Sequence, residues 1–239
     1  MNVVVSQPMF LPWPGLFEQV RLADVFVHYD DVQLPQGRSF MSRVQVKTVN
    51  GPAWMTAPID GARSGRAINE TFLVSGAAWR RRHLATLRHN YARAPHFKAM
   101  MELAERIYAF PEDNLARFNE RAMEEIAAWL GLRTRFLRSS ELGIAGRSTQ
   151  RLVDICRNLG ATDYITGLGA LKYLDHDHFE SQGIAVRYMD YQKRSFPQLH
   201  GEFTPFVTIL DPIANCGIAT SDILVSGTVH WKQVPMQST

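Results

Sequence analysis

The stretch VVVSQPMFLPWPGLFEQVRLADVFVHY, residues 3–29, decides the fold class. Its apolar run at 3–5 ends at a Gln-Pro pair, and the prolines around Trp13 exclude regular structure before a helix-like stretch at 16–23. A second β-like run, rich in β-branched and aromatic residues, follows at 24–29. This order of strand, loop, helix and strand is typical of a βαβ unit in a parallel sheet. The loop after the first strand then lies at the edge where open α/β sheets bind ligands.

The remaining chain alternates between β-like and helical patterns. The β-like segments are 44–48, 54–58, 164–167 and 184–191, and the helical ones are 78–93, 95–110, 112–131, 149–159 and 171–181. An Asn-Gly turn within 49–52 joins the first two β-like segments into a hairpin. The sequence therefore predicts one α/β domain over residues 1–239. Its parallel-sheet core comes from the N- and C-terminal thirds, and a helical insertion occupies about 78–131.

The composition is that of a globular chain. Of its 239 residues, 46% are hydrophobic and 21% are charged, which excludes a disordered or collagen-like protein. No apolar run approaches the roughly 18 residues of a membrane helix, and the first residues lack a secretory signal. We therefore expect a cytoplasmic protein with no membrane partner. The net charge of +3 does not imply nucleic-acid binding. The sequence names no cofactor and leaves the oligomeric state open.

Two aspartates directly follow the second β-like run. Asp30 and Asp31 are candidates for a general base or for an acceptor that orients a substrate, and a role in a turn or helix cap is about equally plausible. Adjacent residues of an extended chain point to opposite sides, so we expect only one of the pair to face a ligand. Gln33 follows them as a further substrate-binding candidate.

The Pro-rich loop after the first strand is stiff. This loop is either a packing device that seats the first helix or one wall of a small-molecule site. In the second case Gln7 supplies an amide donor and acceptor, and Trp13 supplies an aromatic surface. Parallel strands end at one edge of the sheet, so we expect Gln7, one of the two aspartates and Arg43 to line a common pocket.

Several cations are candidates for binding an anionic substrate or donor. Arg38 and Arg43 either pair with an aspartate or bind a substrate anion. Arg88 belongs to an Arg-rich stretch at 80–93 that is either a solvated helix face or an anion site. Lys172 follows the string Thr166-Gly167-Leu168-Gly169, which is either a tight turn or a backbone cradle for an anion.

The histidines offer one acid–base candidate and no metal site. His200 lies in an aperiodic segment that mixes aromatic residues with His and Glu, a composition common in loops that reach over sites. His176 and His178 are two residues apart, so on a helix they do not share a face, and two ligands alone are half a zinc site. We therefore expect no bound metal.

Motifs spread over nearly the whole chain resemble the WbqC-like protein family. They are Gln7-Pro8, Leu11-Pro12-Trp13, Gly15, Phe17, Asp24-Val25-Phe26, Asp30-Asp31-Val32-Gln33, Asn50-Gly51-Pro52, Trp54, Leu159-Gly160-Ala161, Tyr173-Leu174-Asp175, Phe179, Gly183-Ile184, Tyr188, Tyr191, Pro197-Gln198, Gly201, Phe203, Pro205 and Leu210-Asp211. The resemblance implies a bacterial surface-polysaccharide or secondary-metabolite pathway. The chain departs from the family pattern at Ser6, where a His is usual, and at 212–215, where Leu-Leu-Phe-Asn is usual. If that His is catalytic in relatives, this protein has lost or replaced the activity.

The residues are compatible with two functions of different classes. The first is a group-transfer enzyme, acyl or aminoacyl in type, that acts on an amine- or hydroxyl-bearing small metabolite. In it Asp30 or Asp31 acts as the base, Arg38 and Arg43 bind an anionic group, and Gln7 positions the substrate. The second is a non-catalytic small-molecule or partner-binding protein, which the absence of any complete catalytic motif favours.

Overall fold

A six-stranded sheet forms the centre of the molecule. The computed structural model describes residues 1–35, 37, 39–61 and 65–234. In this part of the chain the strands are ordered β5-β2-β1-β6-β7-β8, and β8 alone runs antiparallel to its neighbour. The strands are β1 (Asn2–Ser6), β2 (Val25–His28), β5 (Arg135–Arg138), β6 (Asp163–Thr166), β7 (Ala185–Asp190) and β8 (Gly227–His230). The mixed α/β fold and its mostly parallel sheet are as predicted.

The side chains of β1 divide the interior into two cores, because successive residues of a strand point to opposite faces. Val4 belongs to a large core that it shares with Phe26 of β2. Val3 and Val5 belong to a second core on the other face, together with Val27. The strand is buried on both faces, which explains its uninterrupted run of valines.

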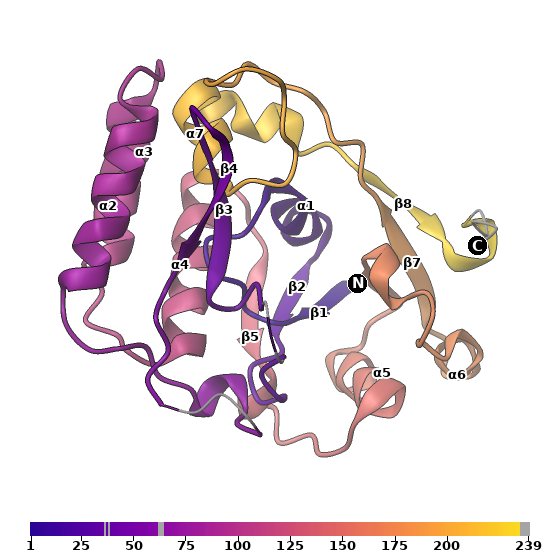
Figure 1. Cartoon of the computed structure of the whole chain (residues 1–239). Coiled ribbons are helices and arrows are strands. Elements are labelled where there is room, and N and C mark those ends of the chain that lie inside the picture. The colour runs from indigo at the N-terminus through magenta and orange to yellow at the C-terminus, as the bar shows by residue number, and fades with distance from the viewer. Residues whose placement is uncertain (36, 38, 62–64, 235–239) are drawn as a thin grey trace.

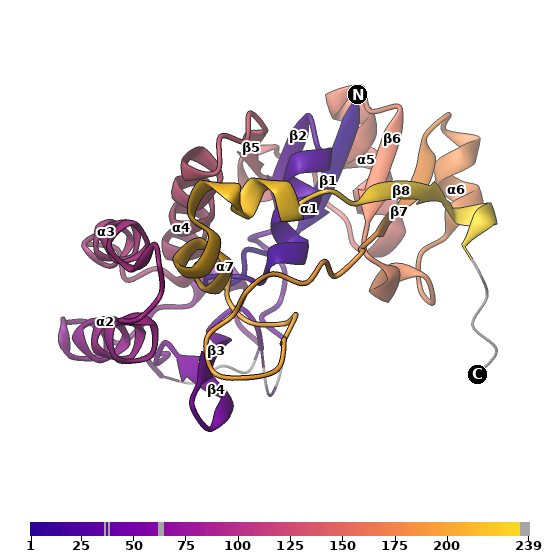
Figure 2. The same cartoon turned by 90° about the horizontal axis from the view of Figure 1, so that it is seen from above.

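Helices cover both faces of the sheet (Figures 1 and 2). The first core contains apolar residues of α1 (Pro14–Leu22) and α4 (Leu115–Trp129), and the second contains those of α5 (Ser148–Leu159) and α6 (His176–Ser181). The helix predicted at 171–181 begins five residues before the observed α6. Residues 168–170 form a separate 3-10 turn, and Asp175 caps α6 by accepting from the His178 N–H.

The parallel strands have the order of a doubly wound sheet. Numbered along the chain, β1, β2, β5, β6 and β7 lie in the order 3-2-1-4-5. The chain leaves β1 toward β2 on one side and later returns to place β6 on the other side. The order therefore reverses between β1 and β6, and this reversal opens a crevice beyond their carboxyl ends. The expectation that residues 3–5, 24–29 and 184–191 share one sheet is confirmed.

The middle of the chain adds a hairpin and a helical layer. The hairpin pairs β3 (Arg43–Thr48) with β4 (Gly51–Thr56), and two helices follow, α2 (Ala78–Tyr91) and α3 (Phe97–Tyr108). Thr48 pairs with Gly51, so the two-residue turn is Val49-Asn50 and Gly51 already begins the second strand, with φ +92°. The three helices expected over the middle section are present. The third, α4, shares the core of the sheet.

The C-terminal segment returns across the molecule beyond β7. It contains α7 (Leu210–Cys216), a 3-10 stretch at 217–223 and β8, none of which the sequence patterns predicted. Glu18 of α1, which is buried, accepts from the Ser226 N–H at 2.9 Å and so attaches this segment to the first helix. Among the described residues no helix is long and apolar enough to cross a membrane.

A buried polar cluster joins the hairpin, α2, α7 and the segment before α7. Lys47 is 2% exposed, and its ammonium group donates to Gln198 Oε1 at 2.9 Å and to the Gly201 and Glu202 carbonyls. Asp211 accepts from the Tyr91 hydroxyl at 2.9 Å and from Gln198 Nε2 at 2.9 Å. Burial raises the pKa of Asp211 to about 6, although these hydrogen bonds and the charge of Lys47 lower it.

Replacing Asp211 by Asn should alter the pH dependence of stability. The carboxyl binds its proton more tightly in the folded chain than at its ordinary pKa of 3.8. Its contribution is therefore fully present below about pH 4 and is lost as the pH rises through about 6. Relative to Asp211→Asn, the wild type should lose on the order of 2 to 3 kcal/mol of unfolding free energy between pH 4 and 7. Urea denaturation across this range measures the difference, and a constant difference would contradict the assignment.

Candidate functional site

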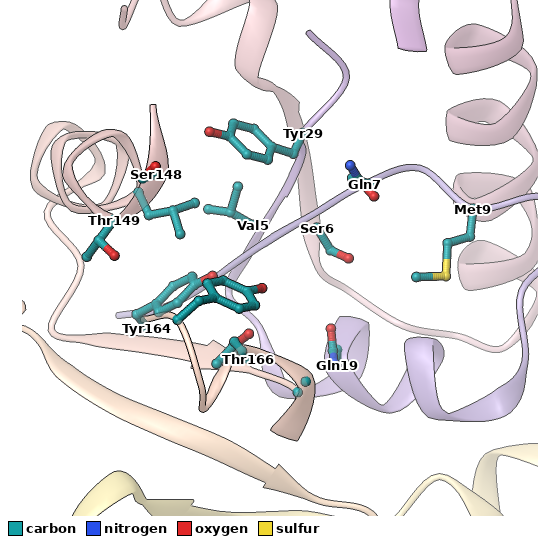
Figure 3. Close-up of a pocket in the computed structure, with 15 residues that line it drawn as sticks. Val5, Ser6, Gln7, Met9, Gln19, Tyr29, Ser148, Thr149, Tyr164 and Thr166 are labelled. Carbon is teal, nitrogen blue, oxygen red and sulfur yellow. The ribbon is translucent and has the colours of Figure 1, made fainter. Parts of the chain in front are cut away.

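A pocket of about 550 Å³ lies at the reversal point of the sheet (Figure 3). Its lining includes Ser6 and Gln7 at the end of β1, and Thr166 and Gly167 at the end of β6. Tyr29, directly after β2, also lines it. This is the position at which open α/β sheets bind ligands, and the volume is in the range of small-molecule sites. The predicted location, at the carboxyl end of the first strands, is where the pocket lies.

The pocket is lined by hydroxyl and amide groups that come from four parts of the fold. In addition to the residues at the strand ends, Gln19 of α1, Ser148 and Thr149 of α5 and Tyr164 of β6 contribute polar side chains. Tyr173, which is 73% exposed, lies at the rim. No Asp, Glu, Lys, Arg, His or Cys is among the described lining residues. The site is therefore polar but uncharged.

Most of these groups are free to bind a ligand. Within the described chain, the side chains of Ser6, Gln7, Gln19 and Ser148 make no hydrogen bond. Thr149 is different, because its hydroxyl accepts from the Asp175 N–H at 3.1 Å. Polar groups that the protein leaves unpaired in a concave site bond either to water or to a ligand.

The loop that carries Gln7 is held in place from the opposite core. Asn119 of α4 is fully buried and donates to the Pro8 carbonyl at 2.9 Å and to the Met41 carbonyl at 2.7 Å. Because these bonds fix the residue after Gln7, the side-chain amide of Gln7 is attached to a rigid backbone. The proposed stiffness of the loop therefore has a physical basis beyond its prolines.

Gly167 and the start of α5 shape the wall opposite Gln7. A Cβ atom on Gly167 would lie 3.1 Å from Gln19 Nε2, so the glycine leaves room for that amide. At the other side α5 begins at Ser148, whose φ of +55° is uncommon for a residue with a side chain.

Asp30 lies outside the pocket. It is 2% exposed, and its carboxylate accepts from the Ser140 N–H at 3.0 Å and the Ser140 hydroxyl at 2.6 Å. Its Oδ1 also lies 3.0 Å from the Ser139 hydroxyl oxygen, whose one proton is shared with Asp31. These bonds attach the end of β2 to the turn that follows β5. The arrangement matches the turn or capping role, and the pocket-lining position expected for one aspartate is not occupied by Asp30.

Asp31 also lies outside the pocket, but it binds Arg151, which in turn lies against Tyr29 of the pocket lining. Its carboxylate binds Arg151 at 2.5 Å and accepts from the Ser139 hydroxyl at 2.5 Å. Burial raises the pKa of Asp31, but these hydrogen bonds and the Arg151 charge outweigh burial and leave it lowered. The Arg151 guanidinium carbon lies 5.0 Å from the centre of the Tyr29 ring. Asp31 therefore reaches the pocket only through Arg151 and Tyr29.

The predicted cationic side chains that the structure describes do not line this pocket, whereas Thr166, Gly167 and Gly169 of the predicted backbone cradle do. Arg43 stacks on Trp54, with 3.5 Å between the guanidinium carbon and the ring centre, and is not in the pocket lining. Arg88 pairs with Glu105 at 2.7 Å and, with Arg81 and His89 of α2, lines a separate pocket of about 460 Å³. Lys172 is exposed and lies beside Tyr173 without lining the pocket. Arg38 lies outside the described residues.

The other three candidates have local structural contacts. Trp13 packs edge-on against Tyr191 and Phe206, with 4.9 and 5.4 Å between ring centres. Gln33 is exposed and forms a β-bridge with Ala67. His200 Nε2 lies 2.7 Å from the Asn90 carbonyl, far from the pocket lining. Among the described residues no group of three His, Cys, Asp or Glu side chains is placed to hold a metal ion.

Tyr29, Gln19, Ser148 and Tyr164 were not predicted as site residues. One signal in the sequence pointed to Tyr29: the residues that end strands next to a reversal of strand order converge on one crevice. Tyr29 ends the extended run one residue before Asp30 and points to the opposite side. Gln19 and Ser148 come from helices, and their approach to the pocket depends on tertiary packing that no local pattern encodes.

Fold and site together define a doubly wound α/β protein with an uncharged polar pocket at the reversal of strand order. The chain belongs to the WbqC-like protein family, whose sequence model matches residues 7–223. It is also similar to the uncharacterized protein Rv1507c of Mycobacterium tuberculosis (strain ATCC 25618 / H37Rv). The two are 34% identical over 226 residues, which cover 93% of this chain and 97% of that protein. No solved structure matches the chain.

Replacing Asp30 by Asn should lower stability without altering the pocket. The variant keeps the shape but turns one acceptor into a donor facing Ser139 and Ser140, and it removes the charge that strengthens the remaining bonds. We expect a loss of about 1 to 3 kcal/mol in unfolding free energy by urea denaturation. Asp222→Asn, at an exposed position, is the matched control and should be neutral. Equal stability of the two variants would show that the Asp30 bonds do not hold the strand end.

Proposed function

We propose that the protein is a group-transfer enzyme, acyl or aminoacyl in type. Its amine- or hydroxyl-bearing small-molecule substrate binds in the pocket between β1 and β6. As part of this proposal the substrate belongs to a bacterial surface-polysaccharide or secondary-metabolite pathway, the context that the family resemblance implies. An anionic group-transfer donor remains part of the proposal, with its own binding surface outside the described pocket lining.

One observation carries the proposal: several unpaired hydroxyl and amide groups face a concave space at the reversal of strand order. Group transfer requires that acceptor and donor be held in a fixed mutual orientation, and orientation alone supplies a large part of such catalysis. Gln7, on a loop held by Asn119, is the residue we assign to positioning the acceptor. Asp31 holds Arg151 next to Tyr29, so its contribution to catalysis is indirect.

The lining also favours a second candidate, a non-catalytic small-molecule-binding protein. The described lining contains no carboxylate, imidazole or thiol that could take a proton from an acceptor. Its phenols are poor bases near neutral pH, because burial raises the pKa of Tyr29 and of Tyr164. A binding protein needs no such group.

Product analysis separates the two candidates. The purified full chain is incubated with acyl thioesters or acyl phosphates and a panel of amine- and hydroxyl-bearing metabolites, and mass spectrometry detects the acceptor plus the transferred group. A group-transfer enzyme gives a product that depends on the protein. We expect Gln7→Leu to reduce the rate by about 10- to 100-fold, the range for loss of substrate positioning.

The matched control is Gln182→Leu, an exposed position remote from the pocket lining, which should keep the wild-type rate. Metabolite binding without any product would reject the enzyme and support the binding protein. A wild-type rate in Gln7→Leu would show that the amide does not position the substrate.

A further inference from the structure

The described lining of the pocket offers no charged side chain to a charged substrate. An ion that enters a concave site loses hydration, and this loss is compensated only by an opposite charge or by several strong hydrogen bonds. The described lining supplies neither a cationic nor an anionic side chain. A ligand that carries a carboxylate or phosphate into the pocket would therefore be disfavoured relative to an uncharged one of the same shape.

The guanidinium of Arg151, which lies against Tyr29 of the pocket wall, is already engaged elsewhere. Arg151 is 6% exposed and is not among the lining residues. Its Nη2 binds Asp31 Oδ2 at 2.5 Å, and its Nε donates to the Ile144 carbonyl at 2.9 Å. Its guanidinium carbon lies 5.0 Å from the centre of the Tyr29 ring, which lines the pocket, and Asp31 offsets the charge. Arg151 therefore fixes a wall of the pocket and does not provide a cation for the ligand.

The free groups suit a ligand with many hydroxyls. A hydroxyl of Ser6 or Ser148 both donates and accepts, and so do the amides of Gln7 and Gln19. Such groups match ligand hydroxyls, which also do both. The tyrosines at the wall and rim, Tyr29 and Tyr173, add flat aromatic surface with a polar end, which suits a ring with an apolar face and a polar edge.

We propose that this pocket selects an uncharged, multiply hydroxylated ring compound, of the pyranose or cyclitol class, over its charged analogues. The inference rests on the proposed function, because it assumes that the pocket is the substrate site. It goes further by assigning the chemical class of the group that the pocket holds.

Two sugars that differ only in the group at C6 test the selection. Methyl glucoside and methyl glucuronide share the same ring, but the second carries a carboxylate in place of the hydroxymethyl group. Titration of the isotope-labelled full chain, followed by NMR, gives both affinities and locates the binding. We expect shifts at Ser6, Gln7 and Gly167 and at least tenfold weaker binding of the glucuronide. Myo-inositol is the cyclitol probe and should bind within tenfold of the glucoside.

A glycine variant shows whether this pocket is responsible. Gly167→Ala places a Cβ atom 3.1 Å from Gln19 Nε2, so the amide must move, and we expect at least threefold weaker glucoside binding. Gly227→Ala is the control, because a Cβ there meets nothing within 4 Å and the residue lies in β8, outside the pocket lining.

The outcomes distinguish failure of the ligand class from failure of the pocket assignment. Tighter binding of the glucuronide, weakened by Gly167→Ala, would overturn the uncharged class and leave the pocket as the substrate site. Binding of none of the three probes, or binding that Gly167→Ala leaves unchanged, would overturn both the class and the pocket assignment.

Discussion

Parallel pairing of β1 on both of its edges is the constraint on which the rest of the structure depends. β1 pairs with β2 through four residues on one side and with β6 through Asn2 and Val3 on the other. A parallel neighbour needs a crossover, and here the crossovers that surround β1 lie on opposite faces of the sheet. The chain segments that leave β1 and β6 therefore diverge and leave a crevice beyond their carboxyl ends. The pocket is a direct consequence of this topology.

The surroundings of the pocket are rigid, while its interior is left open for binding. Each wall is held from behind: the Gln7 loop by Asn119, the end of β2 by the bonds of Asp30, and Tyr29 by the Arg151–Asp31 pair. These supports bury polar and charged groups whose hydrogen bonds offset the cost of burial, although Asn119 Oδ1 is buried without a partner among the described residues. In the described pocket lining, the side chains of Ser6, Gln7, Gln19 and Ser148 are left unpaired. This division between paired supports and unpaired lining is what a preorganised binding site requires.

The sequence predicted the fold well where the pattern alone determines the element. Runs of β-branched residues on both faces mark buried parallel strands, as in β1 and β2. The edge strand β5, Arg-Phe-Leu-Arg, was missed because it is short and its outer residues are charged. The site was predicted less well. The first loop and Gln7 were predicted to line the site, and Gln7 does. The carboxylates of Asp30 and Asp31 suggested catalysis, but in the structure they hold neighbouring segments in place. A sequence shows which residues are polar, but it does not show which of them are already paired. Asp30 and Asp31 are paired with Ser139, Ser140 and Arg151, which lie more than 100 positions away in the chain.

A crystallographic fragment screen tests the central claim, that the crevice between β1 and β6 is the ligand site, most directly because it requires no knowledge of the substrate. Small polar fragments soaked into crystals of the full chain collect where a protein has unpaired groups in a concave site. The account predicts that fragments collect beside Ser6, Gln7, Tyr29 and Thr166. Fragments that bind at the basic face of α2 or at the segment around His200, and leave this pocket empty, would contradict it.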